Sequence, residues 1–126
     1  MHNDISIQKA EAEYKKIKDT MCPAIENVMV RFNAIGFKHL IRKEKRRTPS
    51  EQIGRFKLIK YAPVIIGDPD VSVTYRQNIR ADGRIVRYWG LNKAIEDKRL
   101  RVVIRQVGNG LKHFYSIMEH TSKNPA

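Results

Sequence analysis

The sequence is poor in cysteine and has no long apolar run. Cys22 is the single cysteine among 126 residues, which excludes an internal disulfide and a cysteine-rich zinc site. We interpret it as a small buried residue of a protein in a reducing cytoplasm. No stretch approaches the ~20 apolar residues that span a bilayer, and the N-terminus lacks the apolar segment of a signal peptide. We therefore expect a chain that acts in water, away from membranes.

Motifs of the common enzyme classes are also absent. The sequence has no Walker loop, no Rossmann glycine pattern, no HExxH and no serine nucleophile elbow. Its close acidic pairs, such as Asp68 with Asp70 and Glu96 with Asp97, read as loop or solvated surface rather than as the carboxylate cluster of a two-metal site. We therefore expect neither a cofactor nor a bound metal.

Positive charge, by contrast, is abundant and clustered. The chain has 25 Lys or Arg against 13 Asp or Glu, a net charge of +12. Residues 1–37 are neutral, with five basic and five acidic residues, whereas residues 38–60 hold nine basic residues and two acids. A merely solubilising surface would not require this clustering, so the pattern favours a polyanionic partner, most commonly a nucleic acid.

The first half of the sequence reads as helical. Residues 6–21 are rich in Ala, Glu, Lys and Gln, which favour helix. A second helix is predicted over 23–35, because its apolar residues recur at helical spacing: Ile25, Val28, Met29, Phe32 and Ile35. A third helix is predicted to begin at the N-cap Thr48 and to end at Pro63.

After Pro69 the pattern changes to short strands. Residues 71–76 alternate apolar and polar side chains, the period of a half-exposed strand. Asp82-Gly83 predicts a hairpin that returns over 84–91. Residues 92–99 look like a polar connection. The remaining predicted strands cover 100–107 and 111–119, joined by a turn at Asn109-Gly110.

The order of these elements predicts an α+β fold. N-terminal helices are followed by a four- to five-stranded antiparallel sheet. We expect one domain over 1–126, mainly helical over 1–62 and sheet over 70–119. Residues 38–42 form either a fifth, short strand or a loop, and the sequence leaves both open.

Histidine beside clustered cations suggests RNA cleavage without a metal. That reaction needs a base for the 2′-hydroxyl, an acid for the leaving oxygen, and cations for the charged phosphorane. His39 follows Lys38 and precedes a run of cations that lower a histidine's pKa, which suits a general base. The alternative is an exposed or seam-filling histidine.

Two polar residues of the last predicted strand are further candidates. His113 and Ser116 are three positions apart, so a regular strand places them on opposite faces and only one joins a given site. A hydroxyl at Ser116 can donate to a phosphate oxygen. A structural role for His113 is the alternative reading.

Other residues are candidates for holding RNA. Thr74 and Arg76 share one face of the first strand of the predicted sheet, and an exposed Trp89 would stack on an unpaired base, although a core tryptophan is the simpler reading. Arg101 and Arg105 would extend the basic track. The remaining phosphate- or base-binding candidates are Lys43, Arg46, Arg47 and Tyr115.

Two stretches resemble a known superfamily. They are Gly36-Phe37-Lys38-His39-Leu40-Ile41-Arg42-Lys43 and Lys112-His113-Phe114-Tyr115-Ser116-Ile117-Met118. With the helix-then-sheet order, they resemble the barnase/EndoU/colicin/RelE (BECR) superfamily, in particular colicin-D-like toxins and phage-encoded nucleases. Those members have a tryptophan two residues beyond the serine, where this chain has Met118.

The resemblance implies a metal-independent ribonuclease toxin domain that cleaves tRNA in the anticodon region and leaves a cyclic phosphate. It gives the acid–base work to Lys38 and His39 and the strand hydroxyl to Ser116. From the residues themselves we add Arg76, which would neutralise phosphate, and His113 as the alternative to Ser116. The resemblance further implies an acidic immunity protein, delivery as the end of a larger toxin into a bacterial cytoplasm, and a monomer outside the immunity complex.

Two other functions fit the same charge pattern. One is a non-catalytic module that binds nucleic acid through its cations and aromatic residues. The other is a structural phage or mobile-element protein whose basic surface meets packaged DNA.

Overall fold

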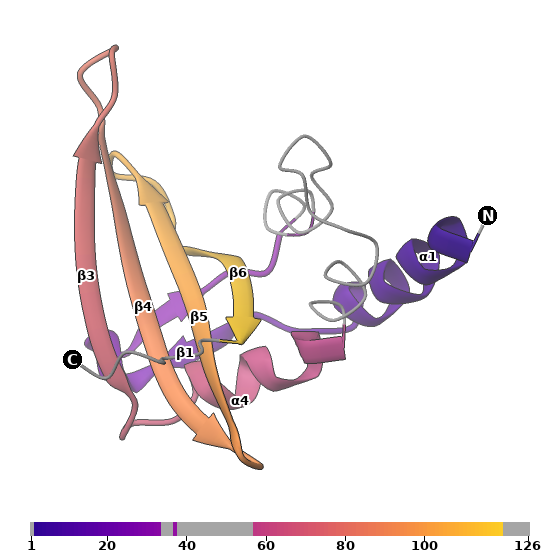
Figure 1. Cartoon of the computed structure of the whole chain (residues 1–126). Helices are drawn as coiled ribbons and strands as arrows, with labels where there is room; N and C mark the ends of the chain where they lie inside the picture. The colour runs from indigo at the N-terminus through magenta and orange to yellow at the C-terminus, as the bar shows by residue number, and fades with distance from the viewer. Residues whose placement is uncertain (1, 34–36, 38–56, 120–126) are drawn as a thin grey trace.

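The computed structural model describes residues 2–33, 37 and 57–119. Its elements, in chain order, are α1 (His2–Lys15), β1 (Thr20–Cys22), η1 (Pro23–Ile25), β2 (Val28–Val30), η2 (Ile59–Tyr61), α4 (Ala62–Ile66), β3 (Ser72–Ile79), β4 (Ile85–Ile95), β5 (Lys98–Val107) and β6 (His113–Glu119). Strands β3 to β6 form an antiparallel sheet in sequential order (Figure 1). The expected α+β class with a four-stranded antiparallel sheet is therefore confirmed.

Turn chemistry sets the register of the first hairpin of this sheet. The Asp82 carboxylate accepts a hydrogen bond from the Arg84 backbone N–H at 3.0 Å, and Gly83 has φ of 89°. Positive φ suits glycine, which has no Cβ to clash. The hairpin predicted at Asp82-Gly83 is confirmed, and its first flanking pair is Ile79 with Ile85.

The polar connection predicted over 92–99 is wrong. Strand β4 continues to Ile95, and β5 begins at Lys98. The two residues between them, Glu96 and Asp97, have φ of 49° and 68°, which matches the positive φ values of a two-residue type I′ hairpin turn. The polar side chains of 92–99 suggested a loop, but strand pairing is made by backbone hydrogen bonds and tolerates polar side chains. Ile95, at the end of β4, still packs against the core.

The second predicted helix, over 23–35, is wrong as well. Strands β1 and β2 pair as an antiparallel hairpin there, joined through η1 and two residues with positive φ, Glu26 and Asn27. Alternation explains the strands: Cys22 and Val30 are fully buried, whereas Met21 and Met29 are exposed. Two short strands with apolar residues on one side thus mimicked a helical stripe.

The first helix is shorter than predicted. It ends at Lys15 rather than near residue 21. Beyond it, the Asp19 carboxylate accepts from the Phe32 backbone N–H at 3.0 Å and pairs with the Arg31 guanidinium. These contacts connect Asp19, just before β1, to the two residues that follow β2.

The prediction that Pro63 ends a helix is wrong. Pro63 lies in the first turn of α4. Proline suits that position because the first helical N–H groups have no intrahelical acceptor. The predicted start of that third helix, at Thr48, lies outside the described residues. So does the segment 38–42, for which a strand or a loop was expected.

The hydrophobic core lies between one face of the large sheet and the other elements. The sheet contributes Leu91, Leu100, Val102, Ile104, Phe114 and Ile117, and the covering elements contribute Ala10, Tyr14, Cys22, Ile25, Val30, Phe37, Leu58, Ile59, Ala62, Ile65 and Ile66. Each fully buried aliphatic or aromatic side chain contributes roughly 1.5–3 kcal/mol. The helices and the small hairpin therefore cover this face of the sheet, which we call the core face.

The β6 edge of the sheet is covered by backbone from the N-terminal half. Arg31, just after β2, forms a parallel bridge with His113. The Arg31 N–H donates to the Lys112 carbonyl at 3.0 Å, and the Phe114 N–H donates to the Arg31 carbonyl at 2.8 Å. Two hydrogen bonds therefore occupy the start of this edge.

Candidate nucleic-acid interface

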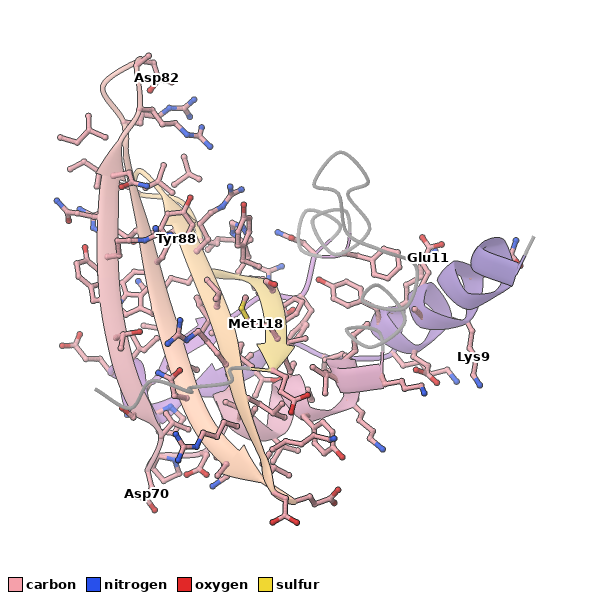
Figure 2. The ribbon with its side chains drawn as sticks, viewed as in Figure 1. Lys9, Glu11, Asp70, Asp82, Tyr88 and Met118 are labelled. Atoms are coloured by element: carbon pink, nitrogen blue, oxygen red, sulfur yellow. The ribbon has the colours of Figure 1, made fainter. Side chains whose placement is uncertain are left out.

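The opposite face of the large sheet, which we call the outer face, brings together side chains from all four strands. Residues directly paired across antiparallel strands share a face. Arg76 of β3 pairs with Tyr88 of β4, which pairs with Arg105 of β5, which pairs with His113 of β6. These residues therefore form one row across the sheet, and the label of Tyr88 in Figure 2 marks the position of the row on β4.

The outer face carries positive charge without acidic neighbours from its own strands. Across the described strands β3 to β6, the single acidic residue is Glu119, and it pairs with Leu100 of the core face. Arg76, Arg101 and Arg105, by register, lie on the outer face. The field above this face is therefore set by guanidinium groups, which attract a phosphate backbone.

A bulge in β6 overturns the expectation that His113 and Ser116 lie on opposite faces. The register shifts between Val103 and Ile104: Val103 pairs with Ser116, Ile104 with Phe114, and Arg105 with His113. Three residues of β6 thus span two residues of β5, and the extra one is Tyr115. Because their partners are two apart on β5, His113 and Ser116 share the outer face.

Four side chains of this face form a continuous stack, which we call the arginine–tyrosine cluster. The Arg76 guanidinium lies 4.7 Å from the Tyr88 ring centroid, and the Arg105 guanidinium lies 4.5 Å from that of Tyr115. The two tyrosine rings meet edge to face, with centroids 5.8 Å apart. Stacking on an aromatic ring holds an arginine plane in place while its N–H groups remain able to bind phosphate.

His113 lies beside this cluster and is buried. Its side chain is 5% exposed, and its Nε2 accepts a hydrogen bond from Arg105 Nε at 3.3 Å. Burial and the Arg105 charge lower its pKa, partly offset by a backbone hydrogen bond to Leu111. The Nε2 lone pair of this histidine is therefore already engaged by Arg105.

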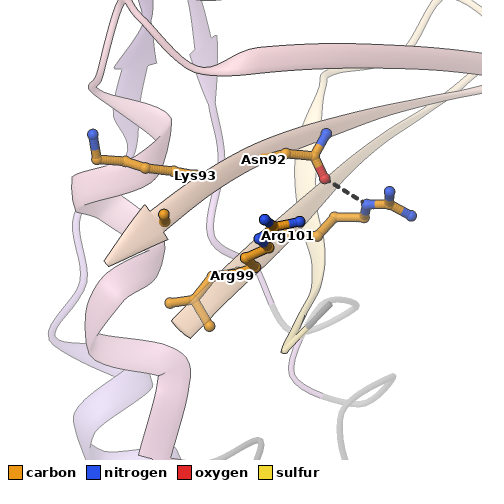
Figure 3. Close-up of a pocket in the computed structure, with 6 residues that line it drawn as sticks. Asn92, Lys93, Arg99 and Arg101 are labelled. Carbon is orange, nitrogen blue, oxygen red and sulfur yellow. Dashed lines mark hydrogen bonds between the residues drawn. The ribbon is translucent and has the colours of Figure 1, made fainter. Parts of the chain in front are cut away.

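A second cationic region lies at the end of the outer face, where β4 turns into β5. Arg101 Nε donates to Asn92 Oδ1 at 2.8 Å, which holds its guanidinium over β4 (Figure 3). Asn92, Arg99 and Arg101 help to line an open pocket of about 360 Å³. Lys93 projects from the other side of β4, where it pairs with Asp68. The outer face is therefore basic from the arginine–tyrosine cluster to this pocket.

Gly90 lets two of these side chains cross the middle of β4. A Cβ at Gly90 would lie 2.6 Å from Thr74 Oγ1 and 3.5 Å from Arg101 Cδ. The first distance is well below van der Waals contact. Glycine is therefore required here by close approach, and the outer face is shallow at this point.

The structure unites five of the predicted site residues and separates one. Thr74, Arg76, His113, Tyr115 and Ser116 all belong to the outer face. Thr74 and Arg76 are exposed, Tyr115 is half-buried, and His113 and Ser116 are buried. The sequence predicted that Thr74 and Arg76 share a face. The bulge in β6 brings His113, Tyr115 and Ser116 to the same face.

Trp89 does not join this group. It pairs with Ile104, a core-face residue, and packs against the hydrophobic core. Its ring lies 5.5 Å from that of Tyr75 and 5.0 Å from the Lys112 ammonium. Trp89 therefore matches the alternative given above, a tryptophan that packs against the core. The other predicted site residues, Lys38, His39, Lys43, Arg46 and Arg47, lie outside the described residues.

Sequence reasoning gave Tyr88 no separate role and treated Arg105 as a general surface cation. A signal was present in both cases. Once the Asp82-Gly83 hairpin pairs Ile79 with Ile85, strand alternation places Tyr88 opposite Arg76. The short turn after Ile95 then places Arg105 opposite Tyr88. Reading 92–99 as a loop prevented that second step.

Among the described residues, no group of three His, Cys, Asp or Glu side chains is arranged to hold a metal ion. Within the same residues, no helix has the length and apolarity needed to cross a membrane. Comparison of the chain with protein-family models, curated proteins and solved structures found no match. The outer face must therefore be interpreted from its own chemistry.

Replacing Gly90 with alanine will destabilise the fold by about 1–3 kcal/mol, the usual cost of an overpacked site. The added methyl group meets Thr74 Oγ1. Combining Gly90→Ala with Thr74→Ala will recover much of this loss, because the clashing atom is gone. Urea unfolding of wild type, both single variants and the double variant measures the coupling. Additive losses would contradict the close contact.

The stability of the protein will fall as pH drops below the ordinary histidine pKa of about 6.5. Because the folded-state pKa of His113 is lowered, the unfolded chain binds a proton that the folded chain rejects. Each such group changes the unfolding free energy by up to about 1.4 kcal/mol per pH unit.

His113→Gln will reduce this pH dependence between pH 7.5 and 5.5, since glutamine does not titrate and its amide oxygen can still accept from Arg105. Urea unfolding at several pH values measures the slope. Equal slopes for His113→Gln and wild type would show that another group carries the dependence.

Proposed function

We propose that this chain is a ribonuclease domain that holds an RNA strand across the outer face of its four-stranded sheet. The arginine–tyrosine cluster carries this proposal. It combines two guanidinium groups with two aromatic rings on a sheet face that has no acidic residue from the described strands. Cations that bind phosphate beside rings that stack on bases are the recurring composition of single-stranded nucleic-acid sites.

The geometry suits a phosphate and an unpaired base at adjacent positions. Arg76 is exposed at β3, and Tyr88, Arg105 and Tyr115 are half-buried beside it. Three strand spacings of about 4.8 Å separate β3 from β6, so the row spans about 14 Å. That length accommodates more than one nucleotide, with Arg101 and Arg99 farther along the same face for the continuing backbone.

Cleavage on this face would be 2′-hydroxyl attack on the adjacent phosphorus, giving a cyclic phosphate and a free 5′-hydroxyl. Arg105 and Arg76 are suited to stabilising the charge on the phosphorane. His39, with Lys38, remains the proposed proton carrier on the strength of the sequence. The BECR-like fold and tRNA as the substrate are proposed from Lys38 and His39 and from the sequence resemblance to that superfamily. An acidic immunity protein would fit the basic outer face.

A non-catalytic RNA-binding module is the second candidate, and one observation favours it. Nε2 of His113, the one described histidine of the outer face, accepts from Arg105, and its ring is 5% exposed. The described residues of this face therefore offer cations and rings for binding but no exposed imidazole. Catalysis depends on His39.

Incubating the protein with total tRNA in EDTA will yield discrete cleavage products, and His39→Ala will abolish them at unchanged circular dichroism. The reason is that the imidazole supplies the proton transfers. Denaturing gels, with detection of cyclic phosphate ends, measure the reaction. Intact tRNA with a salt-sensitive mobility shift would favour the binding module, and cutting only with added metal would refute the mechanism.

RNA binding will depend on the outer face in either case. Arg76→Ala will weaken binding of a single-stranded RNA oligonucleotide and lower the salt slope of log K by about one unit. Tyr88→Leu will weaken it about five- to 150-fold, the loss of one stacking contact of ~1–3 kcal/mol. Fluorescence anisotropy at several salt concentrations measures both.

Lys98→Ala is the matched control for these variants. It removes one positive charge from β5, but Lys98 pairs with Ile95 on the core face. Its affinity will stay near that of wild type. Equal losses for Lys98→Ala and Arg76→Ala would mean that net charge, rather than the outer face, holds the RNA.

A further inference from the structure

Within the part of the chain that the structure describes, no strand pairs with the outer edge of β3. All eight residues from Ser72 to Ile79 are exposed, and among the described residues β3 pairs with β4 alone. The strand contains no proline, no lysine and no bulge, which are usual devices that keep an edge from pairing with another chain, and its one charged residue is Arg76. It therefore presents a regular row of backbone donors and acceptors.

The two edges of the sheet differ in how far their backbone groups are covered. Arg31 covers the start of the β6 edge with two backbone hydrogen bonds. At the β3 edge, large apolar side chains are exposed instead: Val73 is 40%, Tyr75 51% and Ile79 70% exposed. An open ladder beside exposed apolar side chains is the surface that strand addition uses.

The charges flanking β3 are opposite at its two ends. Asp70 precedes the strand and Arg80 follows it, and in the β3–β4 turn Arg84 is paired with Asp82. Figure 2 shows Asp70 and the hairpin tip, marked by Asp82, at opposite ends of β3. An antiparallel copy of the strand would place the acidic end of one chain beside the basic end of the other.

We propose that two copies of this chain associate through antiparallel pairing of their β3 strands, with Tyr75 opposite Tyr75 at the two-fold axis. In this register Thr74 faces Arg76, and Asp70 faces Arg80, each pair occurring twice. On the core face, Ile79 meets Val71 and Val73 meets Gln77. Aromatic and opposite-charge pairs directly across strands stabilise a sheet.

Neighbouring registers are poorer. A shift by two residues toward the hairpin places Arg76 opposite Arg76, a like-charge pair directly across strands, which destabilises a sheet. The opposite shift places Thr74 opposite Thr74 and Arg80 opposite Asp68, whose carboxylate is already paired with Lys93. Shifts by one residue would turn the apolar side chains of one strand toward the polar face of the other. The Tyr75 register alone matches both charge and polarity.

The dimer would join two sheets into one of eight strands. A two-fold axis perpendicular to the sheet keeps both outer faces on the same side, so the two arginine–tyrosine clusters lie on one continuous basic surface. This departs from the monomer expected from the sequence. The net charge of +12 on each copy opposes association, and physiological salt reduces that repulsion because the Debye length is then about 8 Å.

Cysteine cross-linking tests both the dimer and its register. Tyr75→Cys will form a disulfide-linked dimer on mild oxidation with oxidised glutathione, because directly opposed residues in antiparallel strands have Cα atoms about 4.5–5.5 Å apart. The native Cys22 is fully buried, so it gives little background. Non-reducing gels and mass spectrometry identify the linked residues.

Two further cysteine variants serve as matched controls. Val73→Cys and Gln77→Cys chains will not cross-link to themselves, but a mixture of the two will cross-link, since Val73 faces Gln77 in this register. Equal cross-linking of every variant alone would show random collision, and self-linkage of Val73→Cys instead of Tyr75→Cys would show another register. Either result overturns the proposal.

Sedimentation velocity of the unmodified chain at physiological salt will show a concentration-dependent dimer. Asp70→Arg and Arg80→Asp will each raise its dissociation constant about fivefold, because two exposed ion pairs are lost. The double variant will restore dimerisation with the charges exchanged. A monomer at all concentrations, or a double variant as weak as either single variant, would exclude the interface. No RNA is involved, so these outcomes are independent of the ribonuclease proposal.

Discussion

One extra residue in β6 determines what the outer face of this protein can do. Without the bulge at Tyr115, His113 and Ser116 would lie on opposite faces, and the Arg105 partner on β6 would differ. With it, Arg105 contacts both the His113 imidazole and the Tyr115 ring. The bulge therefore places an imidazole, a hydroxyl and a phenol of the edge strand β6 on the outer face, which is the proposed binding surface.

In the proposed function, the core face of the sheet stabilises the fold and the outer face binds RNA. The core face holds Leu91, Val102 and Ile104 against the helices, so its apolar residues stabilise the fold. On the outer face, the arginines and tyrosines of the arginine–tyrosine cluster contact one another. Arg105 is the exception that connects them, because its hydrogen bond satisfies the buried His113. Binding chemistry and folding stability therefore meet at one guanidinium group.

Local turn signals predicted much of the sheet, and non-local packing accounts for what they missed. Asp82-Gly83 fixed one hairpin because its conformation is set within a few residues. The β1–β2 hairpin, over residues with helical spacing, depends on contacts between Asp19 and Phe32 and between Arg31 and β6. Such contacts join distant segments and leave no local pattern. The bulge at Tyr115 likewise depends on its pairing with β5, so strand alternation alone separated His113 from Ser116.

The unequal edges of the sheet connect this architecture to assembly. An exposed eight-residue edge without proline, lysine or bulge is a liability for a lone chain, since it can template aggregation. Its polar side carries Thr74 and Arg76, which belong to the outer face. A strand added there would extend that face beyond Arg76, whereas Arg31 already occupies the start of the β6 edge with two backbone hydrogen bonds. The β3 edge is therefore the side on which the surface of the arginine–tyrosine cluster is most readily enlarged.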